Sequence, residues 1–446
     1  MVRFLVAACF CGFVWVGPAA AQTASLSFEE AVDAAERTAE SVVVARANVD
    51  RAHAQVGVAR AGYMPTVNGS LAYQRTLASE FDDIMFGDPT MMTGDVKLPF
   101  GQPNNWRVNV QVSQPIFDGF RTRSAVSAAE AGMRLSQLDV KSTRAQVVLQ
   151  VARAYYEAAL AERQVEIAEV TLQQAEQTYS ENELGFKQGA TPEFDLVRAE
   201  VARDNQRTLV VQFRVQRDIA FVHLRRLIGV PLDRPLALTS KLEPDDLDAM
   251  IAMARRAAGI AAGNRLAVAQ AKEVVAAREA SVDLARADRL PVLATGTDFG
   301  LVNYENQPFN SQWRTNWTLG VTLTLPIFDG FRRQMQVKSS QADLASARAQ
   351  LQNTREVSDV ETAQARANVE ASKTQLENSV RTVKQAKRAY EIAELRFSQG
   401  ASTHLELVDA RVQLEQALLI QARSARDMRI ARLAEELLPA LPLGGL

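Results

Sequence analysis

Cysteine and histidine, two residue types common in catalytic and metal sites, are scarce in this sequence of 446 residues. The two cysteines, Cys9 and Cys11, lie in an N-terminal segment expected to be cleaved, so the mature chain should have no thiol, disulfide or cysteine metal site. The histidines His53, His223 and His404 are far apart. Neither Gly-x-Ser-x-Gly, His-Glu-x-x-His nor a phosphate-binding glycine loop occurs. The sequence therefore predicts no catalytic residue, no metal site, no cofactor and no enzymatic activity.

Composition narrows the class of protein further. The chain has 50 Lys and Arg against 52 Asp and Glu, a net charge of -2, which argues against a nucleic-acid partner. Mean hydropathy is -0.12, and no apolar run of 18 residues follows the N-terminus, which excludes a polytopic helical membrane protein. Met85, Met91 and Met92 could line a soft-metal path. They fall in a segment of about 79–102 with the composition of a loop, so they are interpreted as loop residues.

Residues 1–21 have the pattern of a secretory signal peptide. A single basic residue, Arg3, precedes an apolar stretch over 4–16, and three alanines at 19–21 supply the cleavage site. The alternative is a lipoprotein signal ending at Cys9. Only eight residues precede that cysteine, too few for an apolar region, so lipidation is disfavoured.

The rest of the chain contains one unit twice. The heptapeptide Pro-Ile-Phe-Asp-Gly-Phe-Arg occurs at 115–121 and again at 326–332, an offset of 211, and the same offset relates Gln-Gly-Ala at 188–190 to 399–401. Repeats of this length are too long for solenoid units and indicate a duplicated domain half. The predicted organisation is a first repeat over 22–229, a linker over 230–243, a second repeat over 244–438 and a tail over 439–446.

Each repeat is predicted to contain a long helical hairpin, over about 119–228 and about 330–438. Val151, Ala158 and Val165 are seven residues apart, and a row of alanines three residues later completes an a/d heptad. An ordinary soluble coiled coil explains these heptads equally well.

Glycines interrupt these helices, and N-capping residues restart them. Thr191 is predicted as an N-cap with Pro192 at the first helical position, and Ser402 stands at the equivalent place in the second repeat. Gly229 should end the first hairpin. Shorter helices are expected to start at Ser27, with a capping box, and at Pro244.

Four segments have the alternation of strands, over about 66–75, 106–114, 292–304 and 316–325. Each is about ten residues long, apolar on one face and uncharged-polar on most of the other, as in outer-membrane strands. A half-buried soluble sheet shows the same alternation. The signal peptide and the position of Trp106, Trp313 and Trp317 at strand ends favour the membrane. Four strands cannot close a barrel, so this interpretation requires a trimer with twelve strands.

The duplicated plan resembles the TolC-like outer membrane efflux factor family over the whole mature chain. The resemblance rests on the repeated heptapeptide, on Leu-Ile-Gly-Val-Pro-Leu at 227–232, and on the glycine-centred turns at 186–191 and 397–402. It implies a mainly α fold with a small β part, in which a trimeric 12-stranded outer-membrane β-barrel continues into a periplasmic α-barrel.

The resemblance also implies roles for individual residues. Glu406 and Asp409 would form acidic rings at the periplasmic constriction, and Asp195 is the counterpart of Glu406; acids in a first helical turn could instead merely favour the helix dipole. A family tyrosine and arginine are replaced by Phe397 and Ser402, so the gating contacts must differ. The tip turns would dock the adaptor, although their glycines could simply cap helices; these residues are Phe186, Gly189, Ala190, Thr191, Phe397, Gly400, Ala401 and Ser402. The strand–helix junctions contain Pro115, Asp118, Gly119, Pro326, Asp329 and Gly330.

The expected function is therefore that of a passive exit duct in the outer membrane, part of a tripartite efflux or type I secretion system. Its expected partners are two further copies of the chain, a periplasmic adaptor (membrane fusion) protein, an inner-membrane pump and outer-membrane lipid. The alternative is a secreted or periplasmic coiled-coil structural or adaptor protein without a pore. The sequence does not identify the transported substrate.

Overall fold

The computed structural model describes residues 24–78, 103–239, 242, 247–257, 259, 265–304 and 313–445. The predicted signal peptide, the methionine-containing loop and the helix start at Pro244 lie outside these residues. The chain divides into two compact units. The helical unit comprises residues up to 44, 140–267 and 357–446, and the sheet unit comprises 45–139 and 268–356. Each unit thus contains segments of both sequence repeats.

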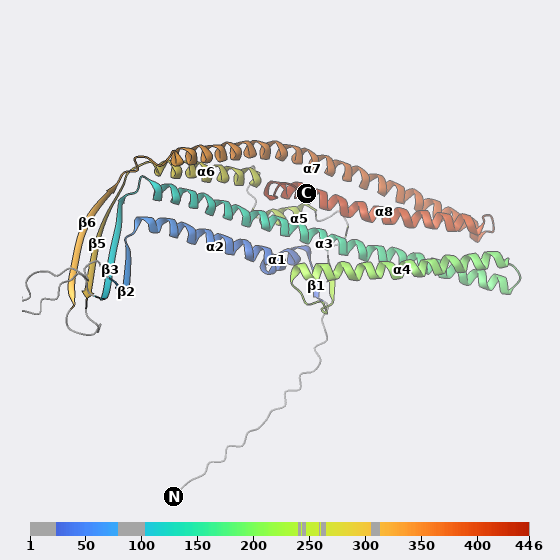
Figure 1. The fold of residues 1–446 in the computed structure, drawn as a ribbon. Helices are drawn as coiled ribbons and strands as arrows, with labels where there is room; N and C mark the ends of the chain where they lie inside the picture. The colour runs from blue at the N-terminus through green and yellow to red at the C-terminus, as the bar shows by residue number, and fades with distance from the viewer. Residues whose placement is uncertain are drawn as a thin grey trace, which may run out of the picture. The chain divides into compact units, whose positions relative to one another are not determined.

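The sheet unit contains one antiparallel sheet with the strand order β2-β3-β5-β6 (Figure 1). The strands are β2 (Thr66–Arg75), β3 (Asn104–Phe117), β5 (Val292–Asn303) and β6 (Arg314–Thr324). β3 is longer than the segment 106–114 predicted for it. It continues through Pro115 because a register shift between Pro115 and Phe117 accommodates an extra residue opposite β5.

Two further strands escaped the sequence analysis. β1 (Ala24–Leu26) pairs in parallel with β4 (Leu236–Leu238), which lies in the segment 230–243 expected to be a linker. Three residues are too few to show alternation, so only the pairing itself defines these strands.

Two helices of 67 residues each, α3 (Arg121–Lys187) and α7 (Arg332–Ser398), are the longest elements. At 1.5 Å per residue each is about 100 Å long. They are followed by α4 (Glu193–Ile228) and α8 (His404–Leu437). The shorter helices are α1 (Phe28–Thr38), α2 (Glu40–Arg60), α5 (Leu247–Ala257) and α6 (Leu266–Ala287), with 3-10 turns at Ala61–Tyr63 and Leu438–Ala440. Among the described helices, none is long and apolar enough to cross a bilayer.

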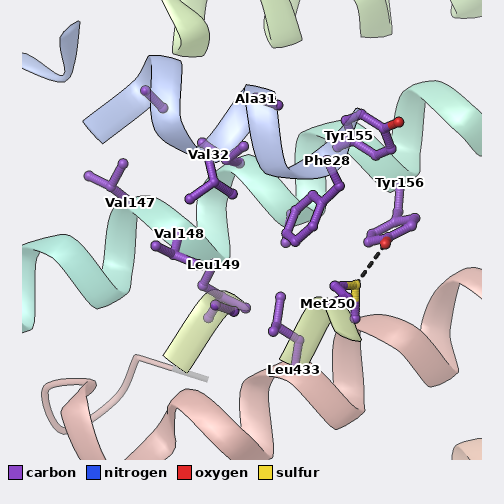
Figure 2. Packing of buried hydrophobic residues seen from close by; sticks show 14 of the residues in the cluster. Phe28, Ala31, Val32, Val147, Val148, Leu149, Tyr155, Tyr156, Met250 and Leu433 are labelled. Atoms are coloured by element: carbon purple, nitrogen blue, oxygen red, sulfur yellow. Dashed lines mark hydrogen bonds between the residues drawn. The ribbon is translucent and has the colours of Figure 1, made fainter. Parts of the chain in front are cut away.

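The main core of the helical unit packs α1 and α5 against α3 and α8. Figure 2 shows Phe28 of α1 beside Tyr155 and Tyr156 of α3, and the Tyr156 hydroxyl donates to Met250 Sδ at 2.7 Å. The heptad predicted in α3 is confirmed, because Val151, Ala158 and Val165 are buried and so are Ala161, Ala168 and Ala175 of the alanine row. In α7 the residues equivalent to the first of these rows, at 362, 369, 376, 383 and 390, are only half-buried in this single chain.

Several predicted helix ends are confirmed and two are wrong. The capping box at Ser27 is present, and Gly229 ends α4 with φ 69°. Thr191 is not the N-cap of α4. That position belongs to Pro192, whose extended ψ of 145° excludes it from the helix, and no side chain caps this end. In the second repeat the N-cap is Thr403 rather than Ser402, and its hydroxyl accepts the Glu406 N–H.

Candidate functional site

The sheet has one apolar face that is exposed in the chain. The register places most of the large apolar residues of the four strands on the same side, so that Leu71 lies opposite Val108 and Phe299 opposite Trp317. Leu319 is 80% exposed and Trp317 is 74% exposed. The face comprises Val67, Leu71, Tyr73, Trp106, Val108, Val110, Val112, Leu293, Phe299, Leu301, Trp317, Leu319, Val321 and Leu323. A continuous apolar surface of this kind requires an apolar environment.

The opposite face of the sheet is polar. It includes Asn109, whose amide nitrogen donates to Asp298 Oδ2 at 2.8 Å across the β3–β5 pair. The other members are small or hydrogen-bonding, among them Asn68, Ser70, Gln74, Asn105, Arg107, Gln111, Ser113, Asn316, Thr318 and Thr322. Such a face is suited to water, so the sheet separates an apolar side from an aqueous one.

The sheet is open at both edges. β2 pairs only with β3, and β6 only with β5, among the described strands. The outer backbone N–H and C=O groups of these two edge strands therefore need partners from elsewhere. In an apolar environment each unpaired group would cost several kcal/mol, so the edges must pair if the apolar face is in lipid.

Aromatic side chains gather where the strands are furthest from the helices. Tyr73 stacks on Trp106 with ring centroids 4.3 Å apart, and Phe299 meets Trp317 at 6.3 Å. The Trp317 ring nitrogen donates to Thr297 Oγ1 at 2.8 Å, so the ring has a polar contact as well as an apolar surface. This combination suits a membrane–water interface.

At the other end of the strands, each heptapeptide turns a strand into a helix. Gly119 and Gly330 both have φ 68°, and at Gly119 a Cβ would lie 2.8 Å from the Ala287 carbonyl oxygen. Asp118 then accepts the Thr122 N–H at 2.7 Å, and Asp329 accepts an N–H in the same way from Arg333 at 3.0 Å. Pro115 and Pro326 precede these turns. The aspartates thus cap α3 and α7.

The tip turns of the two hairpins lie in the helical unit. Gly189 and Gly400 adopt left-handed conformations, with φ 74° and 67°. Each donates its N–H to a phenylalanine carbonyl three residues earlier, Phe186 or Phe397, at 3.0 Å. Ala190 and Ala401, the next residues, donate their N–H groups to the carbonyl oxygens five residues earlier, at 2.8 Å in both turns. The two turns therefore have the same pattern of backbone hydrogen bonds.

Of the predicted gate acids, Glu406 and Asp409 are both exposed in the first turns of α8. Glu406 Oε2 accepts from Ser402 Oγ at 2.7 Å and lies 3.6 Å from Arg396 Nη1. Asp409 Oδ2 accepts from Gln413 at 2.8 Å. The helix holds these two acids together, one turn apart.

Asp195, the third predicted acid, is half-buried near the start of α4 and its charge acts on His404. Sequence reasoning missed His404 as a tip residue. It is 6% exposed, its ring lies 5.9 Å from that of Phe397, and neither ring nitrogen has a hydrogen-bond partner among the described residues. Burial lowers its pKa; Asp195 raises the pKa, whereas Arg198 and Arg411 lower it.

Three further charged residues of α8 are buried, Arg411 and Glu415 near the tip and Arg429 further along the helix. Glu415 Oε1 accepts from Gln206 of α4 at 2.8 Å, and burial raises the pKa of Glu415. His404, Arg411 and Glu415 are seven and four residues apart and therefore lie on one face of α8. Polar residues at this helical spacing were the sequence signal that could have predicted a buried polar row.

Comparisons with known proteins agree with this geometry. The family model described as outer membrane efflux protein matches residues 31–230 and 258–436. The pyoverdine export outer membrane protein OpmQ of Pseudomonas putida is 24% identical over 406 residues, covering 90% of this chain and 83% of that protein. Protein CyaE of Bordetella pertussis is 26% identical over 438 residues, covering 94% and 85%.

Solved structures share the fold. The CmeC outer membrane channel of Campylobacter jejuni superposes with a TM-score of 0.76 at 18% identity, covering 94% of this chain and 86% of that one. The outer membrane protein VceC of Vibrio cholerae gives a TM-score of 0.73 at 19% identity, covering 92% and 95%.

Proposed function

The chain belongs to the outer membrane efflux protein family, and from this premise we propose that it is the outer-membrane exit duct of a tripartite efflux or type I secretion system. The observation that carries the proposal is the sheet, whose exposed apolar face suits lipid and whose polar face suits a water-filled channel. The duct conducts passively, while an inner-membrane pump supplies energy and selects the cargo. The family consists of channel proteins, which supports a transport role rather than an enzymatic one.

Three copies of the chain assemble in this proposal. The unpaired edge of β6 in one copy pairs with that of β2 in the next, so that three sheets of four strands close into twelve. Closure removes every edge that would otherwise face lipid.

The helical unit offers surfaces for the same assembly. α4 exposes apolar residues at heptad spacing, namely Phe194, Val197, Val201, Val211, Val215 and Ile219. Between α7 and α8 lies a groove of about 740 Å³, partly lined by Ala367, Ala371, Ala417 and Ile420. An apolar stripe and a groove lined by small residues are complementary, so we assign them to adjacent copies in the periplasmic helical tube.

The acidic residues of α8 form the constriction in this proposal. Three copies would bring three Glu406 and three Asp409 carboxylates toward one axis, where they would attract cations and repel anions. The glycine turns at the tips would dock the hairpins of a periplasmic adaptor.

Single-channel recording in planar bilayers tests the duct. The purified wild-type chain should give cation-selective currents and should fractionate with the outer membrane. Absence of current from correctly assembled trimers, or fractionation with soluble periplasmic proteins, would instead support the coiled-coil protein without a pore.

A further inference from the structure

The repeated heptapeptide contains apolar residues that turn formation alone does not require. Ile116 and Phe120 are both more than half exposed, as are Ile327 and Phe331 at the second junction. Their neighbours, the glycines and capping aspartates, are enough to turn each strand into a helix. The exposure of these apolar residues therefore needs another explanation. The proposed function supplies part of it, because residues next to the lipid-facing side of the sheet can themselves contact lipid.

The first junction continues that apolar face. The register shift in β3 puts Phe117 opposite Leu293, and Leu293 pairs with Leu323 on the apolar side of the sheet. The Phe120 ring then meets the Phe117 ring edge to face at 5.3 Å. The lipid-facing surface thus extends from the strands to the first turn of α3.

A cavity of about 230 Å³ opens at this junction, and it contains two opposite charges. Phe117, Phe120 and Tyr63 contribute apolar walls, while Asp118 and Arg123 contribute a carboxylate and a guanidinium; Gly62, Pro115 and Ile116 complete the lining. Arg123 makes no hydrogen bond or ion pair with any described residue.

Asp118 remains ionised in this cavity. Burial raises its pKa, but hydrogen bonds from Thr122 and nearby backbone N–H groups outweigh burial and leave the pKa below its ordinary value. The cavity therefore offers a negative group and an unpaired positive group beside aromatic rings.

The second junction lacks this arrangement. At the offset of 211, Gln334 replaces Arg123, so the second junction has no guanidinium at this position. At the first junction a Cβ on Gly62 would lie 2.7 Å from Thr122 Oγ1, so the glycine leaves room for that side chain. The two copies of the heptapeptide are identical, so the difference comes from their surroundings.

We propose that the first junction binds the headgroup of phosphatidylethanolamine, with Arg123 contacting the phosphate and Asp118 the primary ammonium. The glycerol and the start of the acyl chains lie against Phe117 and Phe120, continuous with the lipid-facing strands. This inference rests on the proposed membrane location of the sheet. Guanidinium groups pair well with phosphate oxygens, and an ionised carboxylate accepts hydrogen bonds from a primary ammonium.

The test measures lipid retained by the intact trimer. Wild-type protein with confirmed channel current is equilibrated with vesicles of phosphatidylethanolamine, phosphatidylcholine or phosphatidylglycerol, extracted, and analysed by mass spectrometry. Phosphatidylethanolamine should be retained about tenfold more than phosphatidylcholine, whose methylated ammonium cannot donate a hydrogen bond to Asp118. Arg123→Gln and Asp118→Asn should each abolish this preference while the current persists.

The second junction supplies matched controls. Asp329→Asn removes the same charge from an equivalent helix-capping residue as Asp118→Asn, and Arg332→Gln removes an exposed charge, yet both should leave lipid preference unchanged. Equal retention of the three lipids by conducting wild-type trimers would overturn the inference and leave the duct intact. Equal losses in Arg123→Gln and Arg332→Gln would also overturn it, because they would indicate a general basic surface. Loss of wild-type current would instead count against the proposed function.

Discussion

The turn between α3 and α4 and the turn between α7 and α8 share a backbone but carry different side chains. Gly189 and Gly400 have nearly the same positive φ, and the backbone hydrogen bonds around them match within each pair. At both glycines, no described atom beyond the adjacent residues lies within 4 Å of the position that a Cβ would take. Both repeats have therefore kept a glycine with positive φ at the turn between the two helices.

The side chains around these turns have diverged in charge. At the offset of 211, Arg198 of the first repeat corresponds to Asp409, and exposed Glu193 corresponds to buried His404. The first tip has Arg198 three residues after Asp195, whereas the second tip has Asp409 three residues after Glu406, so that two acids lie on one helix face and Arg396 is near only Glu406. The same turn geometry therefore carries opposite charges at one position of the two tips.

The largest expected effect comes from removing the acids of the second tip. In the double variant Glu406→Gln/Asp409→Asn, the ratio of cation to anion permeability should fall by about tenfold, because a ring of like charges is lost. Reversal potentials in asymmetric salt measure this ratio.

Asp195→Asn is the matched control at the first tip and should change selectivity less, since Arg198 supplies a positive charge where the second tip has Asp409. If Asp195→Asn has the larger effect, the acidic constriction is assigned to the wrong tip.

Alanine at the two turn glycines tests the shared backbone. Gly189→Ala and Gly400→Ala should each destabilise their turn by roughly 1–2 kcal/mol, the cost of a left-handed conformation for a residue with a Cβ. Hydrogen exchange of the amides in each turn measures the change. Because both sites have open space, the two losses should be equal, and a clear inequality would contradict the shared design.

Acidification should loosen the second tip more than the first. The pKa of His404 is lowered from 6.5 by burial, so the stability that its neutral ring contributes is complete above about pH 6.5 and is lost as the pH falls toward the lowered pKa. Each pH unit in that window costs up to about 1.4 kcal/mol. Hydrogen exchange across 396–409, corrected for intrinsic rates, should accelerate as the pH falls below about 6.5 toward the lowered pKa of His404.

His404→Phe keeps a ring against Phe397 and should remove this acceleration. The charges of Asp195, Arg198 and Arg411 all act on the ring, and Asp195 is the one carboxylate among them; Asp195→Asn therefore serves as a second control. Unchanged pH dependence in His404→Phe would exclude the histidine as its source.

The smallest expected effect is the loss of the α8 cap. Thr403→Ala removes the hydroxyl that accepts the Glu406 N–H, at a cost of about 0.5–1 kcal/mol, because the bond is long at 3.4 Å. Pro192→Ala at the equivalent place should lose no cap, since no side-chain cap exists there. Thermal unfolding of both variants measures the difference, and equal losses would show that the two helix starts do not differ in capping.

Much of the architecture could be predicted because it depends on local periodicity. A period of two marks the four strands, and the heptad in α3 marks a buried seam. The N-caps were predicted one residue too early because Thr191 and Ser402 both have capping side chains. Which residue caps depends on where the chain changes from extended to helical backbone, and sequence alone leaves that open by a residue.

Charged residues buried between distant segments could not be predicted. Arg265 donates to Ser358 Oγ at 2.8 Å and to the Leu438 carbonyl oxygen at 2.6 Å, and it pairs with Glu361. Glu361 in turn accepts the Gly444 N–H at 2.6 Å. These partners lie about 90 to 170 residues from Arg265, so no local pattern signals the cluster.

The sequence by itself determined the duplication, the strand and helix segments, and the positions of the turns, because these follow from spacing and from glycine and proline along the chain. The tertiary structure was needed to show that His404 is buried with no hydrogen-bond partner among the described residues, and that Asp118 and Arg123 line one cavity. Burial and cavities depend on which distant segments meet, and the identical heptapeptides show that the same local sequence can have different neighbours.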